Sequence, residues 1–265
     1  MDNLILIKLG GSLITDKKRS FHAKESVIRR LAKEIKEAKK SISGKIIVGH
    51  GSGSFGHIVA AKYQTQKGII NKKSVLGAAF VEDVAVQLNR IVIKNFLKAG
   101  LPVFSFSSGS FIIAKDQKPE KFFLKAVLQG LHLGFVPVVY GDVVLDLKRG
   151  FGIFSTEKVL NILASNLKKH FKALRIIHCG DTDGVYDEKG RTIPLITKDS
   201  FSKFKKAIGV SKTIDVTGGM LHKVEESVKL VEKIGVESVI MNGNVPDGLK
   251  QVLLGKKKKG ITIVR

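Results

Sequence analysis

Short apolar runs that end on glycine are the feature that most constrains the fold of this chain. Three of them are Leu4–Leu9, Ile46–Val48 and Val136–Tyr140, and a glycine follows each one directly. The runs are almost continuously apolar rather than alternating, which is typical of strands buried on both faces. Helical segments separate them, so the sequence predicts a largely parallel sheet covered by helices.

Between these runs, apolar side chains recur every three or four residues, which is the period of a helix. We therefore expect helices over residues 24–41, 75–97, 119–133, 155–170 and 246–254, and another that begins near Gly219. Further strands are expected over residues 102–107, 110–114, 152–154, 174–178, 238–241 and 261–264. No Pro/Ser-rich linker or internal repeat divides the 265 residues. The predicted fold class is α/β, a three-layer α/β/α sandwich with a largely parallel central sheet, in one domain of two lobes.

The charge balance restricts the partners of the chain. Lysine and arginine total 46 against 23 acidic residues, so the formal net charge is +23. Such a field attracts anions, whether nucleotides, phosphorylated substrates or nucleic acid. Aromatic residues make up only 7% of the chain, tryptophan is absent, and the lysines are scattered apart from the run Lys256–Lys259. A base-stacking platform is therefore hard to assemble, and small anionic ligands are favoured over nucleic acid.

Signals for a compartment are few. No apolar run approaches the roughly 18 residues of a membrane span, and the amino terminus lacks the basic region and cleavage site of a signal peptide. The single cysteine, Cys179, excludes an internal disulfide and suits a reducing environment. We expect a cytoplasmic protein without a membrane partner.

The densest glycine segment is Gly49–His57, in which four glycines are followed by a histidine. Glycine permits positive φ and close backbone approach, so several N–H groups can converge on one anion. A helix that starts near Ser54 would add its amino-terminal charge. Gly51–Gly56 also matches the GxGxxG pattern of dinucleotide-binding turns, but that pattern requires an acidic residue about 20 positions further on, where this chain has Asn71–Lys73. The segment is therefore interpreted as a phosphate loop, with His57 beside the phosphate.

Three lysines lie at or beside glycine-rich turns: Lys8, Lys17 and Lys223. A lysine at a strand end or helix start suits phosphate better than packing. Together they indicate phosphoryl transfer, which depends on positioning and charge neutralisation. The chain has no Walker A motif, no GxSxG elbow and no cluster of His, Cys and carboxylates with metal-ligand spacing. A P-loop enzyme, a serine hydrolase and a protein-held metal site are therefore not expected.

A family resemblance rests on four blocks: Lys8-Leu-Gly-Gly-Ser12, Gly49–His57, Asp181-Thr-Asp-Gly-Val-Tyr186 and Thr217–Lys223. Their order, and their spread over nearly the whole chain, resemble the amino acid kinase superfamily. Within it, Gly-Ser-Phe-Gly-His57 most resembles the archaeal-type isopentenyl phosphate kinase family. The resemblance implies a homodimer that uses ATP and Mg²⁺ to phosphorylate isopentenyl phosphate to isopentenyl diphosphate, for isoprenoid biosynthesis. It also implies an acceptor lobe over residues 1–170 and a nucleotide lobe over residues 171–265.

The resemblance further implies roles for single residues. Lys8 would face the transferring phosphoryl group, Lys17 would stabilise the transition state, and His57 would bind the acceptor phosphate. The implied catalytic residues are Lys8, Lys17, His57 and Glu157. The implied ATP-binding residues are Lys8, Gly10, Gly11, Ser12, Gly53, Asp181, Tyr186, Gly219 and Lys223. The implied acceptor-binding residues are Ser52, Gly53, His57 and Thr156, and the candidates for an apolar tail pocket or ordinary core are Phe80, Val84 and Ile153.

Two positions depart from the family pattern. Ser52 stands where many members have glycine, and Glu157 stands near the place where an aspartate usually organises the active-site lysines. Glu157 could take that role with one more methylene.

Alternatives stay open at this point. One is a kinase of another phosphate or phosphonate acceptor, of the fosfomycin kinase type, and the other is a basic nucleotide-binding protein without catalysis. An amino-acid acceptor is less favoured, because the amino-acid kinases of the superfamily lack the histidine at position 57. Residues 64–74, polar and rich in lysine, are expected to form a mobile loop, and whether it closes over the site stays open.

Overall fold

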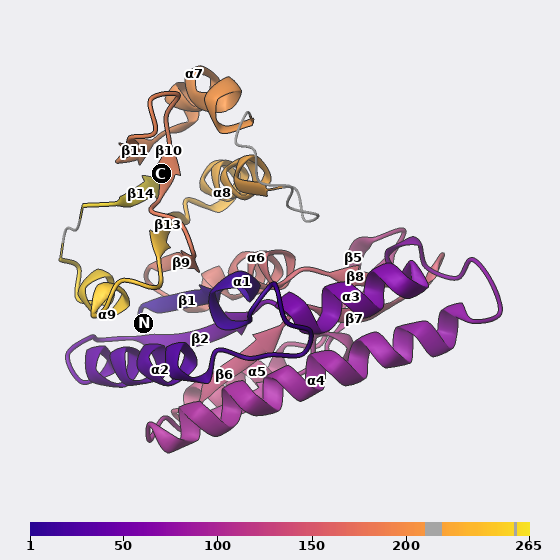
Figure 1. The fold of residues 1–265 in the computed structure, drawn as a ribbon. Helices are drawn as coiled ribbons and strands as arrows, with labels where there is room; N and C mark the ends of the chain where they lie inside the picture. Colours follow the sequence, from indigo (N-terminus) through magenta and orange to yellow (C-terminus); the bar gives the residue numbers. More distant parts are fainter. Residues whose placement is uncertain (210–218, 257–258) are drawn as a thin grey trace.

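The computed structural model describes residues 1–209, 219–256 and 259–265 (Figure 1). At its centre is an eight-stranded sheet in the order β12-β14-β13-β9-β1-β2-β6-β3. The strands are β1 (Leu4–Leu9), β2 (Lys45–His50), β3 (Val103–Phe106), β6 (Val136–Tyr140), β9 (Leu174–Gly180), β12 (Leu195–Ile196), β13 (Glu237–Asn242) and β14 (Ile261–Val264). Neighbouring strands of this sheet are parallel except for β13 and β14. The largely parallel sheet predicted from the apolar runs is confirmed.

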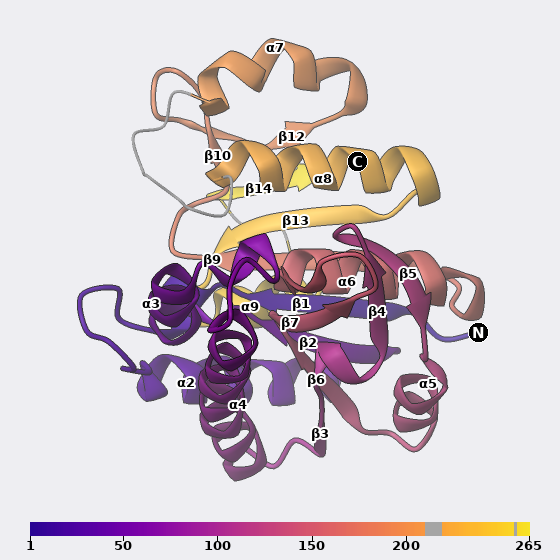
Figure 2. The same cartoon turned by 90° about the vertical axis from the view of Figure 1, so that its right-hand side faces the viewer.

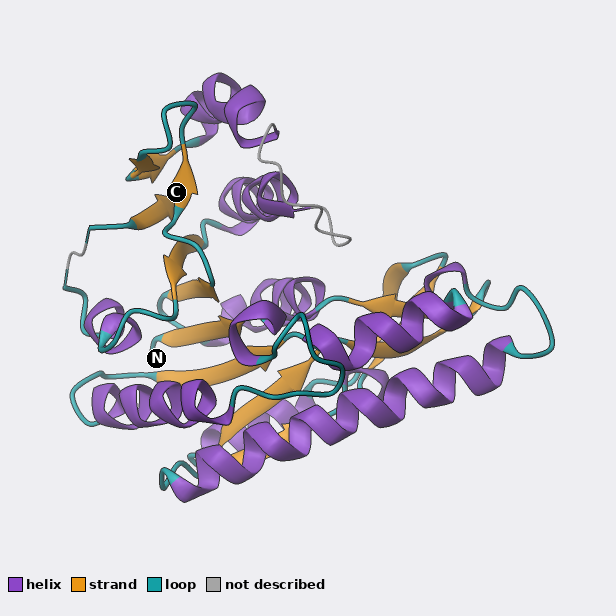
Figure 3. Ribbon diagram, viewed as in Figure 1, coloured by secondary structure: helices purple, strands orange, loops and turns teal. Residues whose placement is uncertain are grey.

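Helices cover both faces of the main sheet (Figure 3). They are α1 (Gly11–Ile14), α2 (Glu25–Lys39), α3 (Gly53–Tyr63), α4 (Ser74–Lys98), α5 (Lys125–His132), α6 (Thr156–Leu167), α7 (Lys198–Gly209), α8 (Gly219–Ile234) and α9 (Gly248–Leu253), with 3-10 turns at Thr65–Lys67, Ser108–Ser110 and Lys168–His170. One face of β1, with Ile5 and Ile7, packs in a core with α2, α4 and α9. The opposite face, with Leu4 and Leu6, packs with α5 and α6. The three-layer α/β/α sandwich is therefore confirmed.

The part of the chain that carries α7 and α8 forms a smaller third core with β13 and β14. A two-stranded sheet, β10 (Val185–Tyr186) with β11 (Thr192–Ile193), belongs to the same region. No helix among the described residues is long and apolar enough to span a membrane.

A second sheet of four strands lies at the edge of the sandwich, in the order β5-β4-β7-β8 (Figure 2). Its strands are β4 (Ile112–Lys115), β5 (Lys118–Phe122), β7 (Asp142–Asp146) and β8 (Gly150–Phe154). The helix predicted over residues 119–133 is wrong in its first part, because β5 pairs with β4 there and α5 begins only at Lys125. Apolar spacing over so short a stretch cannot separate a strand from a helix, and cross-strand pairing such as Ile112 with Phe122 decides it.

Asp146 links the β4–β5 turn of this small sheet to its β7–β8 turn. Its carboxylate accepts backbone hydrogen bonds from Asp116 at 3.0 Å, Gln117 at 2.7 Å, Lys148 at 2.8 Å and Arg149 at 3.0 Å. Burial by itself raises the pKa of Asp146, but the four N–H groups outweigh it and lower the pKa to about 2. The charged carboxylate is therefore part of the fold at neutral pH.

Asp146→Asn is expected to destabilise the chain by about 2–4 kcal/mol at neutral pH, because the amide turns a donor toward backbone N–H groups that need an acceptor. The contribution of Asp146 is fully present above the ordinary pKa of 3.8 and is lost as the pH falls through about 2. Denaturant unfolding of both proteins at several pH values measures this, and the gap between them should narrow in acid. Asp116→Asn is the matched control, because Asp116 lies in the β4–β5 turn that Asp146 holds but has an exposed carboxylate. A gap that does not change with pH would contradict the assignment.

Residues 64–74, expected as a mobile loop, are attached to the small sheet. The amide of Ile69 donates to the carbonyl of Arg149 at 3.0 Å, and the side chain of Gln117 donates to the carbonyl of Gln66 at 3.2 Å. The start of the segment is the 3-10 turn Thr65–Lys67. It therefore lies against the β7–β8 hairpin in this structure.

Candidate active site

Two glycine-rich turns touch each other at the carboxyl ends of β1 and β2. A Cβ placed on Gly11 would lie 2.6 Å from the nitrogen of Gly53, and one placed on Gly51 would lie 2.9 Å from the nitrogen of Gly11. Gly53 also has a positive φ of 49°. Only glycine allows the two turns to approach in this way, at the sheet edge where open α/β folds bind ligands.

A helix starts in each of the two turns. The sequence predicted a helix start in the turn after β2. α3 begins at Gly53, so its first amides face this edge. The amide of Ser54 is already engaged, because it donates to Oγ1 of Thr15 at 3.0 Å, and the amide of Gly10 donates to the carbonyl of Cys179 at 2.8 Å. The sequence-based expectation of an anion at this loop therefore depends on the other amides of the two turns.

Lys8 and Glu157 form an ion pair beside these turns. Nζ of Lys8 lies 2.6 Å from Oε1 of Glu157, and the two side chains are 11% and 25% exposed. Glu157 lies in the first turn of α6, which Ser155 caps by accepting the amide of Lys158 at 3.2 Å. Burial alone would raise the pKa of Glu157, but the charge and hydrogen bond of Lys8, with Lys223 further away, lower it to about 2. The carboxylate is therefore ionised and available to orient Lys8.

Lys223 lies on α8, close enough to this pair for its charge to act on Glu157 and on His178. The structure thus brings together Lys8, Glu157 and Lys223, which the sequence had placed in three distant segments. Gly219 starts α8 with a positive φ of 64°. Thr217 and Gly218 of the same predicted block lie outside the described residues.

His178 is a residue of this cluster that the sequence interpretation missed. His178 lies on β9, directly opposite Lys8 of the neighbouring strand β1, and is only 4% exposed. Burial and then the charges of Lys223 and Lys8 lower its pKa to about 3, so the imidazole is neutral. Its Nδ1 has no hydrogen-bond partner among the described residues. Strand register, which the sequence does not display, is the signal that would have revealed it.

Lys17 lies on an exposed turn after α1. The turn is closed by a bridge between Thr15 and Ala23, and the amide of Asp16 donates to the carbonyl of His22 at 2.9 Å. The ring of Phe21, in the same turn, packs edge-on against Phe55 of α3 with centroids 5.7 Å apart. The turn that carries Lys17 is therefore fixed to the helix that carries His57.

His57 is on α3 and has an exposed side chain. Ser52, which precedes the helix, is partly buried, and Thr156 is 2% exposed. Oγ1 of Thr156 donates to the carbonyl of His50 at 2.7 Å and accepts the amide of Gly141 at 3.0 Å. The hydroxyl of Thr156 thus links α6 to the ends of β2 and β6 in this structure.

A group of buried polar side chains lies at the ends of β2 and β6. His50 is stacked on Tyr140 with centroids 5.4 Å apart, and its Nε2 lies 3.1 Å from Nδ2 of Asn89. Burial lowers the pKa of His50 to about 4 and raises that of Asp142 to about 7. Asp142 accepts a hydrogen bond from Oγ of Ser107 at 3.1 Å. These groups connect β2, β3, β6 and β7 beneath the sheet edge.

The three candidates for an apolar tail pocket have different surroundings. Val84 is 8% exposed and belongs to the main core, whereas Ile153 is partly buried on β8. Phe80 is 44% exposed and stacks on Tyr63 with centroids 5.7 Å apart.

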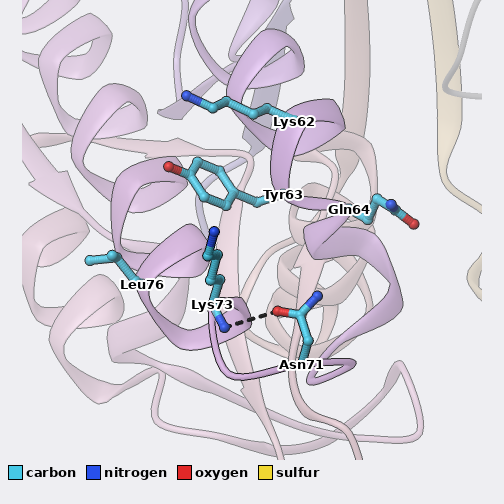
Figure 4. A pocket seen from close by; sticks show the side chains of 6 residues that line it. All are labelled: Lys62, Tyr63, Gln64, Asn71, Lys73 and Leu76. Atoms are coloured by element: carbon cyan, nitrogen blue, oxygen red, sulfur yellow. Dashed lines mark hydrogen bonds between the residues drawn. The ribbon is translucent and has the colours of Figure 1, made fainter.

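A pocket opens beside the ring of Tyr63, between the end of α3 and the start of α4 (Figure 4). Its lining residues are Lys62, Tyr63, Gln64, Asn71, Lys73 and Leu76. Tyr63 is ten residues beyond Gly53, and a helix of that length spans about 15 Å. The pocket is therefore separate from the turn that carries the glycines.

Asp181 and Tyr186, predicted from the sequence to bind ATP, are exposed in the segment after β9. The amide of Asp183 donates to the hydroxyl of Tyr186 at 3.2 Å. A small pocket adjoins this segment, lined by Asp183, Met241, Asn242, Val245, Gly248, Lys259, Gly260 and Ile261. Asp181 directly follows the carboxyl end of β9, which lies beside β1 in the main sheet.

Comparison with known proteins identifies the class that this fold and site define. The Amino acid kinase family model matches residues 3–242, so the chain belongs to the amino acid kinase family. The isopentenyl phosphate kinase of Methanothermobacter thermautotrophicus is 34% identical over 98% of both chains, and that of Methanocaldococcus jannaschii is 31% identical over 96% of both. A crystal structure of isopentenyl phosphate kinase superposes with a TM-score of 0.80, at 31% identity, over 98% of this chain and 99% of the other. The family resemblance inferred from the four sequence blocks is confirmed.

Proposed function

We propose that this chain transfers the γ-phosphoryl group of ATP to isopentenyl phosphate and releases isopentenyl diphosphate and ADP. The full-length similarity to enzymes of that name is the observation that carries the proposal. The Lys8–Glu157 ion pair at the meeting point of the glycine turns supports it, because phosphoryl transfer needs an oriented cation there.

The proposed roles follow from the placement of each group. Lys8, Lys223 and the turn amides neutralise the transferring phosphoryl group, and Glu157 keeps the ammonium of Lys8 oriented. Lys17 approaches from the turn after α1, and His57 binds the phosphate of the acceptor. Residues 1–170 would hold the acceptor and residues 171–265 the nucleotide.

Magnesium is part of the proposal as an ion held by ATP. Among the described residues, no group of three or more His, Cys, Asp or Glu side chains could hold a metal ion. Mg²⁺ commonly keeps several waters and binds through substrate phosphates, so in this role it needs no protein cage. When bound it would neutralise charge on the donor phosphates.

We also propose a homodimer that acts in the cytoplasm, where ATP is available. One side of α4 is buried in the core, but Val75, Leu76, Phe80 and Leu97 expose large apolar side chains on the same helix. Val75, Leu76 and Phe80 lie within the first two turns of the helix, and exposed apolar side chains grouped in this way are typical of a contact with another chain.

A coupled assay of ADP release tests the function directly. The panel contains isopentenyl phosphate, fosfomycin and acetylglutamate, each with ATP and Mg²⁺. Turnover of isopentenyl phosphate above the others supports the proposal, and preference for fosfomycin favours the alternative acceptor class. A folded protein that turns over none of them contradicts the proposed function.

His57→Ala is expected to lower kcat/KM for isopentenyl phosphate by roughly 10–10²-fold, because a hydrogen bond to a charged phosphate is lost. The affinity for a non-hydrolysable ATP analogue, measured by calorimetry, should stay unchanged. His57→Gln keeps a side-chain N–H donor and should retain part of the activity. His132→Ala, on the exposed end of α5, is a control without effect. Equal losses in acceptor use and nucleotide affinity would show that His57 is misplaced in this scheme.

A further inference from the structure

Arg30 and Glu34 on α2 reach across to the segment that follows β13. The Nη1 atom of Arg30 lies 2.5 Å from Oε1 of Glu34, and its Nη2 atom donates to the carbonyl of Gly243 at 2.5 Å. Nη1 also approaches the carbonyl of Val245 at 3.4 Å. The guanidinium therefore holds the first half of the segment 243–250.

Glu34 holds the second half of the same segment. Its side chain is only 5% exposed, and its Oε2 accepts the amides of Leu249 at 3.0 Å and Lys250 at 3.2 Å. A buried carboxylate that is paired with a guanidinium and bonded to two amides is a strong, directional contact. Arg30 and Glu34, both within residues 1–170, thus fix both ends of the segment 243–250, which belongs to residues 171–265.

The fixed segment lies at the functional edge of the sheet. The amide of Gly243 donates to the carbonyl of Gly180, at the end of β9, at 2.8 Å. A Cβ on Gly243 would lie 2.4 Å from a methyl carbon of Leu13, which belongs to the turn after β1. The segment therefore touches both the first glycine turn and the end of the strand that leads to Asp181.

The same segment forms one wall of the small pocket beside Asp183. Val245 and Gly248 line that wall. Polar groups come from Asn242, which ends β13, and from Asp183, which lies in the segment after β9. The pocket measures only about 20 Å³, so it admits a single polar group of a ligand, and its carboxylate and amide side chains suit a hydroxyl group of a nucleoside.

We propose that Arg30 and Glu34 are positioning residues for the nucleotide, which hold the segment 243–250 where it contacts the nucleoside part of ATP. The inference rests on the proposed function, since it takes ATP as the ligand of this lobe. Neither side chain touches the nucleotide itself. Their loss should weaken nucleotide binding and leave the chemistry at Lys8 intact.

The test compares Arg30→Met with the wild type by calorimetry, with a non-hydrolysable ATP analogue and no acceptor. The Kd of the analogue and the KM for ATP should both rise roughly tenfold. The kcat at saturating ATP and the KM for isopentenyl phosphate should stay within about twofold. Arg30→Lys keeps a charge beside Glu34 with fewer donors, so it should give a smaller rise, and it carries the same test if the methionine variant does not fold.

Glu37→Gln is the matched control. Glu37 pairs with Lys250 at 2.5 Å, so it joins the same two helices, α2 and α9, but its carboxylate is exposed and holds no pocket wall. It should bind the analogue as the wild type does.

The outcomes separate the inference from the proposed function. A folded Arg30→Met protein with unchanged analogue affinity overturns the inference, and so does an equal fall in kcat and in the affinity for both substrates. Wild-type protein that binds no analogue overturns the proposed function instead.

Discussion

Glu157→Gln is expected to lower kcat by about 10²-fold, because the ammonium of Lys8 loses the charge that orients it and a small displacement at a reacting centre has effects of this size. Nζ of Lys8 lies 2.6 Å from the carboxylate, and both groups are largely buried. Glutamine preserves the shape of the side chain but not its charge. Steady-state kinetics measures the loss, and the KM for both substrates should change far less than kcat.

The acidity of Glu157 sharpens this expectation. Its pKa is held near 2, so the carboxylate is charged throughout the range in which kinases are assayed. The ratio of wild-type to Glu157→Gln activity should therefore be independent of pH above about 5. If the ratio instead fell as the pH was lowered through that range, Glu157 would be taking up a proton there and would not be a permanent counter-ion.

Glu157→Asp is the informative companion variant. The family resemblance implies an aspartate near this position. The Glu157→Asp variant keeps the negative charge, but its side chain is one methylene shorter, so the carboxylate lies further from Lys8. Its kcat should lie between the wild type and the glutamine variant. Thermal unfolding of all three proteins serves as the control, because removal of one partner from a buried pair also destabilises a fold. An aspartate variant as slow as the glutamine variant would show that distance matters as much as charge.

Local composition was sufficient to predict the sheet and the close approach of the two glycine turns. Apolar runs such as Leu4–Leu9 predicted buried parallel strands, and the glycines of Gly49–His57 predicted a close approach of backbone. The structure shows why glycine is needed, since Gly11 and Gly53 leave no room for a Cβ between the two turns. Such signals are readable because each acts within a few residues of its own position.

Features that depend on long-range pairing could not be predicted. Residues 118–122 form a strand because β4 is available to pair with them, and His178 joins the site because β9 lies beside β1 in a particular register. Glu157 was recognised as a departure, but only the fold places its carboxylate on Lys8. The contact of Arg30 and Glu34 with residues 243–250 likewise spans more than 200 positions of sequence.

Lys17→Ala is expected to lower kcat by roughly 10²–10³-fold, the effect of removing one preorganised donor from a charge that develops in the transition state. The affinity for isopentenyl phosphate and for an ATP analogue should change little, since the contact strengthens only as the phosphoryl group moves. The turn that carries Lys17 is fixed to α3 through Phe21 and Phe55, so its position relative to His57 is set by the fold.

Lys18→Ala separates this role from the general charge of the chain. Lys18 follows Lys17 in the same exposed turn, and its backbone amide, which the substitution leaves in place, donates to Asp16 at 2.9 Å. If the field of a chain with net charge +23 were responsible, both variants would lose activity to the same small extent and added salt would reduce the difference from the wild type. A specific transition-state contact predicts a large loss of activity for Lys17→Ala alone. Lys17→Arg should retain part of the activity, because its charge reaches the same phosphoryl oxygens in a different geometry.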